Sequence, residues 1–184
     1  MNAARENILD RVRAALRVPA HRPPDPTDAP IFLPVINSEQ RFRDEFAILK
    51  GEVVTDLPAF LKEFPRIASD VPDLVPSNAS VRDSDLGVTG CDCLIAQTGS
   101  IAVSTRSAGG RALSVLPPVH LVIARRDQIV PDLVTAMELL RCRYDKHWPS
   151  SLSLITGPSR TADIAKILVM GAHGPKRLAV YFVS

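Results

Sequence analysis

The sequence predicts an α/β protein in which a mainly parallel sheet lies between layers of helices. From residue 119 onward, apolar runs of strand length alternate with helical patterns, and such alternation is typical of parallel strands joined by right-handed crossovers. The run from Val119 to Ala124 is almost entirely apolar, as expected of a strand covered on both faces. A chain of 184 residues is long enough for one domain with a proper core. We therefore expect a three-layer α/β/α domain.

The first 36 residues are predicted to form a helix and an extended arm of their own. In the helix, expected over residues 2–17, Ile8, Val12 and Leu16 recur at helical spacing and arginines fill the other face. Six of the chain's 16 prolines lie between residues 19 and 34, and proline-rich segments are extended and semi-rigid. The expected units are therefore residues 1–36, the helix and proline-rich arm, and residues 37–184, the α/β domain.

Short helices and strands are predicted between residues 37 and 106. One helix is expected from Ser38, its N-cap, to Lys50, and another from Pro58, which suits a first helical turn, to about Phe64. Two apolar runs, residues 94–96 and 101–103, are predicted to be the strands of a hairpin that turns at residues 97–100. The other expected elements are strands at residues 52–54 and 66–68 and a loop at residues 71–80.

The rest of the chain carries the alternating pattern. A helix is predicted to begin at Arg111 and stop at Pro117, and Pro131 is predicted to open a helix that runs to Arg141. The other expected elements are strands at residues 119–124, 151–156 and 178–182 and a helix at residues 162–170 that ends at Gly171. Ligands of open α/β sheets bind beyond the carboxyl ends of the strands, so the loops after Ala124 and Thr156 are expected to lie near a site.

Composition excludes several classes of function. The formal net charge of +2 is too small to indicate a nucleic-acid surface. No apolar run reaches the ~18 residues of a membrane span, and the first residues lack the apolar stretch of a secretory signal. The three cysteines, an odd number without zinc or iron–sulfur spacing, indicate reduced thiols rather than disulfides or a metal site. We therefore expect a cytoplasmic protein without a metal.

Two segments offer backbone N–H groups and hydroxyls to an anion. In the turn at residues 97–100, Gly99 can adopt a positive φ, and the N–H groups beside Thr98 and Ser100 can form an anion-binding nest. Residues 157–163 are predicted to join a strand to a helix, whose first N–H groups attract anions. The expected ligands in that segment are Gly157, Ser159, Arg160, Thr161 and Asp163. The alternative is structural: a plain hairpin turn and ordinary helix capping.

A few other residues are candidates for binding or proton transfer. Gly109, Gly110 and Arg111 precede another predicted helix and allow the same two interpretations. His173, in a glycine-bearing loop, is the candidate proton carrier, whereas His120 lies in an apolar strand, where a structural histidine is more common. Asp92, next to the Thr89-Gly90 pair, is a candidate general base or a partner for turn amides.

Three sequence blocks stand out by their order and spacing. They are residues 87–100 (GVTGCDCLIAQTGS), residues 110–120 (GRALSVLPPVH), and residues 156–164 (TGPSRTADI) with residues 171–175 (GAHGP). Together they resemble the LUD-domain family of lactate utilisation protein C. The resemblance extends from about Phe42 to the C-terminus.

This resemblance implies a fold, a process and partners. The implied fold is that of the NagB, RpiA and CoA-transferase group, whose members bind sugar phosphates, CoA esters or folate-like anions at strand-end loops. The implied process is the oxidation of L-lactate to pyruvate alongside two iron–sulfur partner proteins. Nothing in the sequence resembles a complete flavin, nicotinamide or iron–sulfur site, so no cofactor is expected on this chain and the clusters are expected in the partners.

Three hypotheses about function follow. The first is a carboxylate-binding component of a lactate-oxidising system, with Arg160 or Arg111 holding the carboxylate. The second is a non-catalytic assembly subunit whose N-terminal helix and arm dock the iron–sulfur partners. The third is an enzyme acting on a sugar phosphate or CoA ester. Gln97 and Ala165 stand where the family commonly has glutamate, which weighs against independent catalysis; the oligomeric state is left open.

Overall fold

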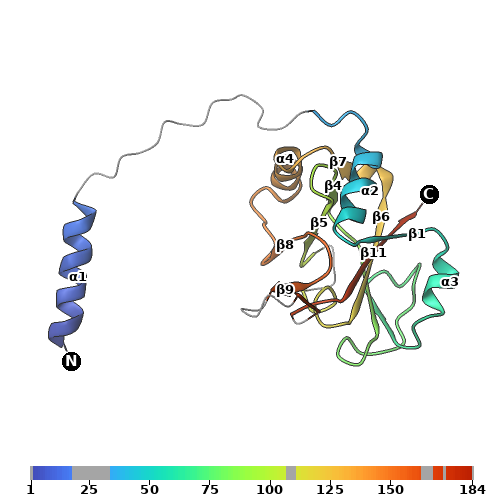
Figure 1. Ribbon diagram of the computed structural model, residues 1–184, viewed down its shortest axis with the longest axis horizontal. Coiled ribbons are helices and arrows are strands. Elements are labelled where there is room, and N and C mark those ends of the chain that lie inside the picture. The colour runs from blue at the N-terminus through green and yellow to red at the C-terminus, as the bar shows by residue number, and fades with distance from the viewer. Residues whose placement is uncertain (1, 18–33, 107–110, 163–167, 172, 184) are drawn as a thin grey trace. The chain divides into compact units, whose positions relative to one another are not determined.

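The computed structural model describes residues 2–17, 34–106, 111–162, 168–171 and 173–183. Contacts within the chain divide it into residues 1–33 and residues 34–184, which are described separately. In the first unit the predicted helix is confirmed as α1 (Asn2–Leu16; Figure 1). Its side chains Ile8, Val12 and Leu16 are exposed. None of the helices among the described residues is long and apolar enough to cross a membrane.

A five-stranded parallel sheet forms the centre of the second unit. Its strands are β1 (Glu52–Val54), β2 (Ile67–Ser69), β3 (Leu86–Thr89), β6 (Val119–Arg125) and β11 (Arg177–Val183). They lie in the order β1-β11-β6-β3-β2, and every neighbouring pair is parallel. The α/β class and the mainly parallel central sheet are thus confirmed. No strand was predicted at β3, which contains Gly87 and Thr89.

A second, four-stranded sheet covers one face of the first. It consists of β4 (Cys93–Ile95), β5 (Ser100–Ser104), β7 (Ile129–Val130) and β8 (Leu152–Ile155), in the order β7-β4-β5-β8. The predicted hairpin is confirmed as the antiparallel pair β4–β5. The expectation that residues 151–156 join the parallel sheet is wrong, because β8 pairs antiparallel with β5. Its sequence alternates serine and leucine, which is typical of an antiparallel strand with one covered face.

Four helical segments complete the α/β unit: α2 (Ser38–Ile48), α3 (Leu57–Leu61), a short 3₁₀ turn η1 (Arg126–Gln128) and α4 (Leu133–Tyr144). Side chains cap three of them. Asn37 accepts a hydrogen bond from the Gln40 N–H, so the N-cap of α2 lies one residue before the predicted Ser38. Asp56 caps α3 and Asp132 caps α4 in the same way, which fixes where each helix begins.

Two predicted helices are replaced by other structures. Residues 160–162 form β9 (Arg160–Ala162), which pairs antiparallel with β10 (Leu168–Met170). The helix predicted over residues 162–170 is therefore wrong at both of its ends, and residues 163–167 lie outside the described residues. A short apolar run such as Leu168–Met170 cannot be assigned to helix or strand by its pattern alone. The helix predicted at Arg111 is also wrong: the N–H groups of Val115 and Leu116 both bond the Ala112 carbonyl, a single turn that ends before Pro117.

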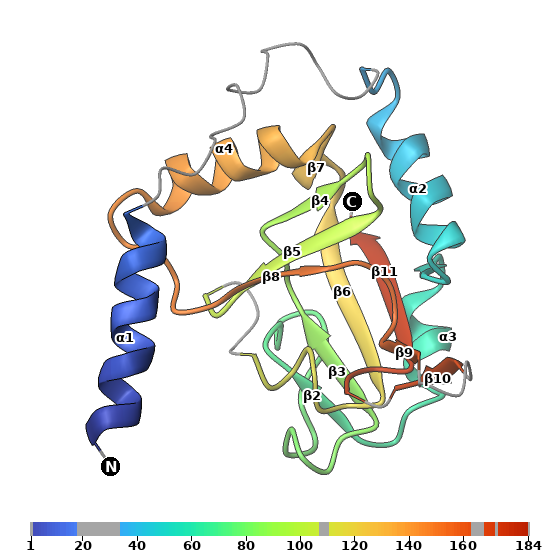
Figure 2. The ribbon, with the colours of Figure 1, turned by 60° about the vertical axis from the view of Figure 1, so that its left-hand side comes forward.

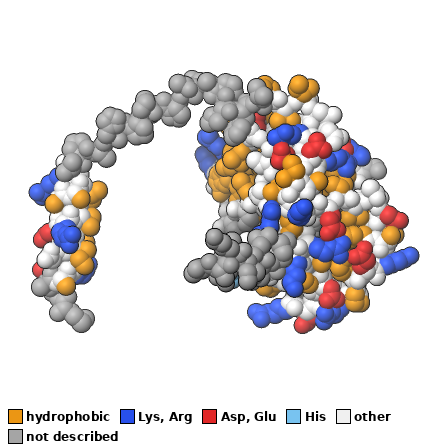
Figure 3. All heavy atoms as spheres, in the orientation of Figure 1, with side chains coloured by type: hydrophobic (Ala, Val, Ile, Leu, Met, Phe, Trp, Pro, Cys, Tyr) orange, Lys and Arg blue, Asp and Glu red, His pale blue; other side chains and the backbone are white. Residues whose placement is uncertain are grey.

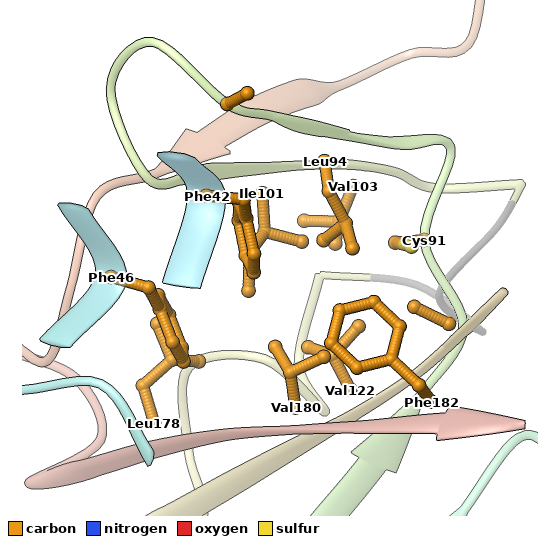
Figure 4. Packing of buried hydrophobic residues seen from close by; sticks show 12 residues of the cluster. Phe42, Phe46, Cys91, Leu94, Ile101, Val103, Val122, Leu178, Val180 and Phe182 are labelled. Atoms are coloured by element: carbon orange, nitrogen blue, oxygen red, sulfur yellow. The ribbon is translucent and has the colours of Figure 1, made fainter. Parts of the chain in front are cut away.

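The core lies in layers on both sides of the parallel sheet (Figure 2). One face packs against α3 through residues that include Leu57, Phe60 and Leu121. The other face packs against α2 and the second sheet, where Phe42 and Phe46 meet side chains of β4, β5, β6 and β11 (Figure 4). The outer face of the second sheet packs against α4. Helices therefore cover both sides, and the second sheet is an additional layer between α4 and the parallel strands.

Candidate anion-binding site

A small hollow at the carboxyl end of β5 is lined mainly by hydroxyl groups. The side chains and backbone around it come from β5, from the segment at residues 111–114 and from the start of β8. The lining residues are Val103, Ser104, Thr105, Arg111, Ser114, Ser151 and Ser153. Arg111 is exposed, so its guanidinium is accessible to a ligand. The Arg111 guanidinium is suited to a carboxylate or phosphate, and the hydroxyls make the rest of the lining polar, although Ser114 already donates to the Arg111 carbonyl.

The segment that carries Arg111 is placed by a close approach to the parallel sheet. Gly87 lies in β3 beside His120 in β6. A Cβ at residue 87 would lie 2.4 Å from the Leu113 carbonyl oxygen and 2.7 Å from the Pro117 ring. Only glycine leaves room for this backbone. Ser114 then turns back and donates its hydroxyl to the Arg111 carbonyl at 3.1 Å.

A buried polar network supports the floor of the hollow. Asp92, 1% exposed, accepts a hydrogen bond from Arg143 at 3.0 Å, and Tyr144 donates its hydroxyl to the same carboxylate oxygen. Arg143 also bonds the Asp92 carbonyl at 3.0 Å. The Tyr144 oxygen lies 2.8 Å from Ser104 Oγ, and Ser104 in turn accepts the Arg106 N–H. Burial and the bond to Asp92 raise the pKa of Tyr144, so this hydroxyl keeps its proton at neutral pH.

The opposite end of β5 holds a second group of hydroxyls. Thr98 donates to Ser100 at 2.8 Å, and Ser100 lies 2.8 Å from the Thr156 hydroxyl. Two glycines with positive φ shape this end: Gly99 at +61° and Gly157 at +85°. A Cβ at Gly157 would lie 3.1 Å from an Arg160 guanidinium nitrogen. Arg160 therefore comes close to this end, from β9 and not from a helix N-terminus.

The loop that contains His173 joins the same end through Ser159. The Ser159 N–H bonds the Pro175 carbonyl at 2.9 Å, and the Gly171 N–H bonds the Ser159 carbonyl at 2.9 Å. A Cβ at Gly174 would meet the Ser159 side chain at 3.3 Å. His173 itself is exposed. Backbone hydrogen bonds thus join the two halves of the third sequence block.

The predicted ligands fall into two groups and do not surround one point. Ser100 and Ser104 begin and end β5, and four residues of extended chain span about 14 Å. Thr98, Gly99, Ser100, Gly157, Ser159 and Arg160 gather toward the first end, whereas Arg111 lies at the second with the Asp92 network. Thr161 belongs to β9; Gly109, Gly110 and Asp163 lie outside the described residues, as does Ala165.

Several site residues were missed by sequence reasoning. Arg143 and Tyr144 follow the helical pattern of α4 and gave no separate signal. The β5–β8 pairing brings Ser151 and Ser153 beside β5, and Ser114 becomes their neighbour only in the lining of the hollow. The alternation of serine with leucine at residues 151–154 was the one available sign, because it leaves every second side chain polar on one face.

The histidine in β6 and the cysteines lie away from the hollow's lining. His120 is fully buried, its Nε2 lies 2.8 Å from Thr89 Oγ1, and burial lowers its pKa to about 4. Cys91 and Cys93 are buried free thiols and Cys142 is exposed. Burial raises the pKa of Cys91 and brings that of Cys93 to about 11. Within the described ranges, no three His, Cys, Asp or Glu side chains are placed to hold a metal ion.

The fold and the two clusters of hydroxyl side chains, one at each end of β5, define an α/β domain with a candidate anion site beside a second, mixed sheet. Residues 78–183 match the family model of the LUD domain. This match covers more than half of the chain. The chain belongs to the LUD domain family.

Curated relatives carry one recurring name. Lactate utilization protein C of Anoxybacillus flavithermus is 36% identical over 100 residues, which are 54% of this chain and 44% of that protein. The protein of the same name from Deinococcus radiodurans is 36% identical over 119 residues, or 64% of this chain and 54% of that one. The Bacillus subtilis protein is 33% identical over 103 residues, covering 55% and 43%. The match spans about half the length of these relatives.

A solved structure shares the fold. It is the crystal structure of a DUF162 family protein from Deinococcus radiodurans, with a TM-score of 0.56 and 22% identity. The match covers 80% of this chain and 96% of that one.

Proposed function

We propose that this chain is a component of an L-lactate utilisation system and binds a small carboxylate in the hollow at Arg111. The process is taken from the relatives, which are named for lactate utilization and match this chain at 31–36% identity. The observation that carries the site is the lining of the hollow, where one exposed guanidinium faces five hydroxyls. Such a set can pair with a carboxylate and satisfy its remaining lone pairs.

The two predicted arginines have different surroundings, which favours Arg111. Arg111 stands beside a buried network that holds Ser104 through Tyr144 and Asp92. Arg160 stands beside a chain of neutral hydroxyls that already bond one another. The Asp92 carboxylate is occupied by Arg143 and Tyr144, so its role is to support Ser104 and not to act as a general base. His173 belongs with the Ser100 end of β5, so it would serve as a proton carrier only if the ligand binds at that end and not in the hollow at Arg111.

The partners proposed for this chain are iron–sulfur proteins. Oxidation of lactate to pyruvate releases two electrons and two protons, so it needs an electron acceptor, and the iron–sulfur clusters of the partners are the acceptor proposed here. The chain would supply the carboxylate site and the partners the redox centres, with no cofactor held by this chain. The cytoplasm is the proposed location.

Calorimetric titration with L-lactate and with pyruvate tests the carboxylate site. We expect saturable binding that weakens at least tenfold in Arg111→Ala and less than twofold in Arg160→Ala, because only the first removes the guanidinium of the hollow. The two substitutions remove the same side chain from exposed positions, so each controls for the other. Loss of binding in Arg160→Ala alone would move the site to the Ser100 end. No saturable binding of either acid would reject it.

A second candidate function is the docking of the iron–sulfur partners by residues 1–34. The observation in its favour is α1, whose apolar side chains Ile8, Val12 and Leu16 are exposed. Deletion of residues 1–34 discriminates the two functions. Loss of partner association with carboxylate binding retained would assign assembly to this segment, whereas unchanged association would reject that role. Including a sugar phosphate and a CoA ester in the titrations tests the third hypothesis from the sequence.

A further inference from the structure

The hollow at Arg111 has a rim and a floor of different character. Arg111 is exposed, whereas Ser104 and Ser114 in the same lining are 3% and 6% exposed. The guanidinium therefore lies toward solvent and the two serines lie at the floor. The volume open to a water-sized group inside the hollow is about 10 Å³, which is room for about one such group. A ligand held by Arg111 can thus insert only one small substituent among the lining residues.

The hydroxyl of Ser114 offers lone pairs, and not a proton, to such a substituent. Ser114 Oγ lies 3.1 Å from the Arg111 carbonyl oxygen. A carbonyl oxygen cannot donate, so the proton of this hydrogen bond comes from Ser114. A serine hydroxyl has one proton and two acceptor lone pairs. With its proton directed at the carbonyl, Ser114 can only accept a hydrogen bond from a ligand.

The turn that carries Ser114 is held at two points, which fixes the direction of this hydroxyl. The N–H groups of the two residues that follow it both bond the Ala112 carbonyl. The Leu113 carbonyl lies against Gly87 in β3. Thr105 in the same lining differs, because its hydroxyl lies 3.2 Å from another hydroxyl and either oxygen can donate. Ser114 is therefore a fixed acceptor, whereas Thr105 can adapt to its ligand.

Charge alone cannot distinguish the small acids that Arg111 can hold. Acidic and basic side chains are interspersed on the face of the α/β unit that Figure 3 shows, and small monocarboxylic acids carry the same charge. L-Lactate, pyruvate and propionate share three carbons and one carboxylate. They differ at the second carbon, which carries a hydroxyl, an oxo oxygen or hydrogens alone. Of these three, only the hydroxyl donates a hydrogen bond to an acceptor such as Ser114.

We propose that Ser114 makes the hollow selective for a 2-hydroxy acid over the corresponding 2-oxo acid. This inference rests on the proposed function, in which Arg111 holds the carboxylate. The 2-hydroxyl donates to Ser114, whereas an oxo oxygen would set two acceptors against each other with no proton between them. The hydroxyl proton is one of the two that oxidation removes, so the product is held less tightly than the substrate.

Calorimetric titration of the full chain with L-lactate, pyruvate and propionate tests the selectivity before any substitution is made. We expect L-lactate to bind at least about fivefold more tightly than either of the others, with pyruvate the weakest. Equal affinities for the three acids, each weakened in Arg111→Ala, would overturn this inference and leave the proposed carboxylate site standing. No saturable binding of any of the three would reject both.

The variant Ser114→Ala separates selection from support of the turn. We expect it to weaken L-lactate at least about fivefold and pyruvate less than about twofold, so that the preference for L-lactate disappears. A purely structural role of Ser114 would weaken both acids alike and keep their ratio, which would overturn the proposal.

The matched control is Ser153→Ala, because it removes a hydroxyl of the same lining from β8 and leaves the turn intact. We expect it to change the ratio of the two dissociation constants by less than about twofold. Selectivity lost in Ser153→Ala but kept in Ser114→Ala would assign the selection to β8 and contradict the role of Ser114.

Discussion

The two sheets of this domain accommodate buried polar groups in opposite ways. In the second sheet, Asp92, Ser100 and Ser104 are buried and each has hydrogen-bond partners. At the parallel sheet, two buried atoms among the described residues have none: His120 Nδ1 in β6 and Asp70 Oδ1 just after β2. The first arrangement is a supporting network, and the second is a cost to stability.

The difference follows from what each sheet packs against. The parallel strands are covered by apolar side chains on both faces, so a polar group there finds few donors or acceptors. The second sheet meets α4, whose last turn brings Arg143 and Tyr144 to Asp92. The buried polar network therefore lies where the end of α4 meets the smaller sheet. The parallel sheet mainly supplies apolar surface for the smaller sheet to pack on.

Removal of Asp92 is expected to have the largest effect. We expect Asp92→Ala to lower the free energy of unfolding by about 3–4 kcal/mol, because it leaves the Tyr144 hydroxyl and the Arg143 guanidinium without their buried partner. Urea denaturation measures this. The matched control is Ser100→Ala in the same sheet, expected to cost about 1 kcal/mol for a lost neutral hydrogen bond. Equal costs for the two would show that the Asp92 network has no special weight.

His120 is expected to make the fold sensitive to acid. Its pKa is about 4 in the folded state against an ordinary 6.5, so below pH 6.5 the unfolded chain takes up a proton that the folded chain does not. The contribution of neutral His120 to the free energy of unfolding is fully present above pH 6.5. It falls as the pH drops toward 4, and at pH 4.5 about 2–3 kcal/mol of it is lost. We expect His120→Gln to lose that much less between pH 7 and 4.5. Parallel urea curves at both pH values measure the difference, and identical pH slopes would contradict it.

Asp70 is expected to change the free energy of unfolding with the opposite pH dependence and by a smaller amount. Burial raises its pKa to about 6 from 3.8, so ionisation costs stability as the pH rises from 3.8 through 6. We expect Asp70→Asn to raise the free energy of unfolding at pH 7.5 by about 1–2 kcal/mol, reduced for the part of the side chain that water reaches. Asp73→Asn, an exposed neighbour, is the control and is expected to change it by less than about 0.5 kcal/mol. A loss of stability in Asp70→Asn would show that the backbone hydrogen bonds to the ionised carboxylate, such as that from Gly90, outweigh the cost of its burial.

The sequence predicted the elements whose pattern is local. The hairpin at residues 94–103, the long helix α4 and the apolar strand β6 each follow from spacing within the element. The helix predicted at residues 162–170 failed because Leu168–Met170 owes its strand conformation to pairing with Arg160–Ala162. The predicted ligands do not form one site for a similar reason. Residues 97–100 and Arg111 are near in sequence, but they lie at opposite ends of β5. Pairing between distant segments, such as β5 with β8, left only the serine–leucine alternation of residues 151–154 as a sign in the sequence.

The two glycines that flank the end of α2 have a consequence for the order of folding. A Cβ at Gly99 would lie 2.7 Å from the Phe46 nitrogen, and one at Gly157 would lie 2.9 Å from the Leu49 carbonyl. The surface on which α2 packs therefore includes turns that lie about 50 and 110 residues later in the chain. Contacts of such separation form late, because the chain between them must first close. During synthesis the rings of Phe42 and Phe46 stay partly uncovered until β11, which carries Leu178, Val180 and Phe182 of their cluster, has left the ribosome. This helix is therefore the segment that we expect a chaperone to hold.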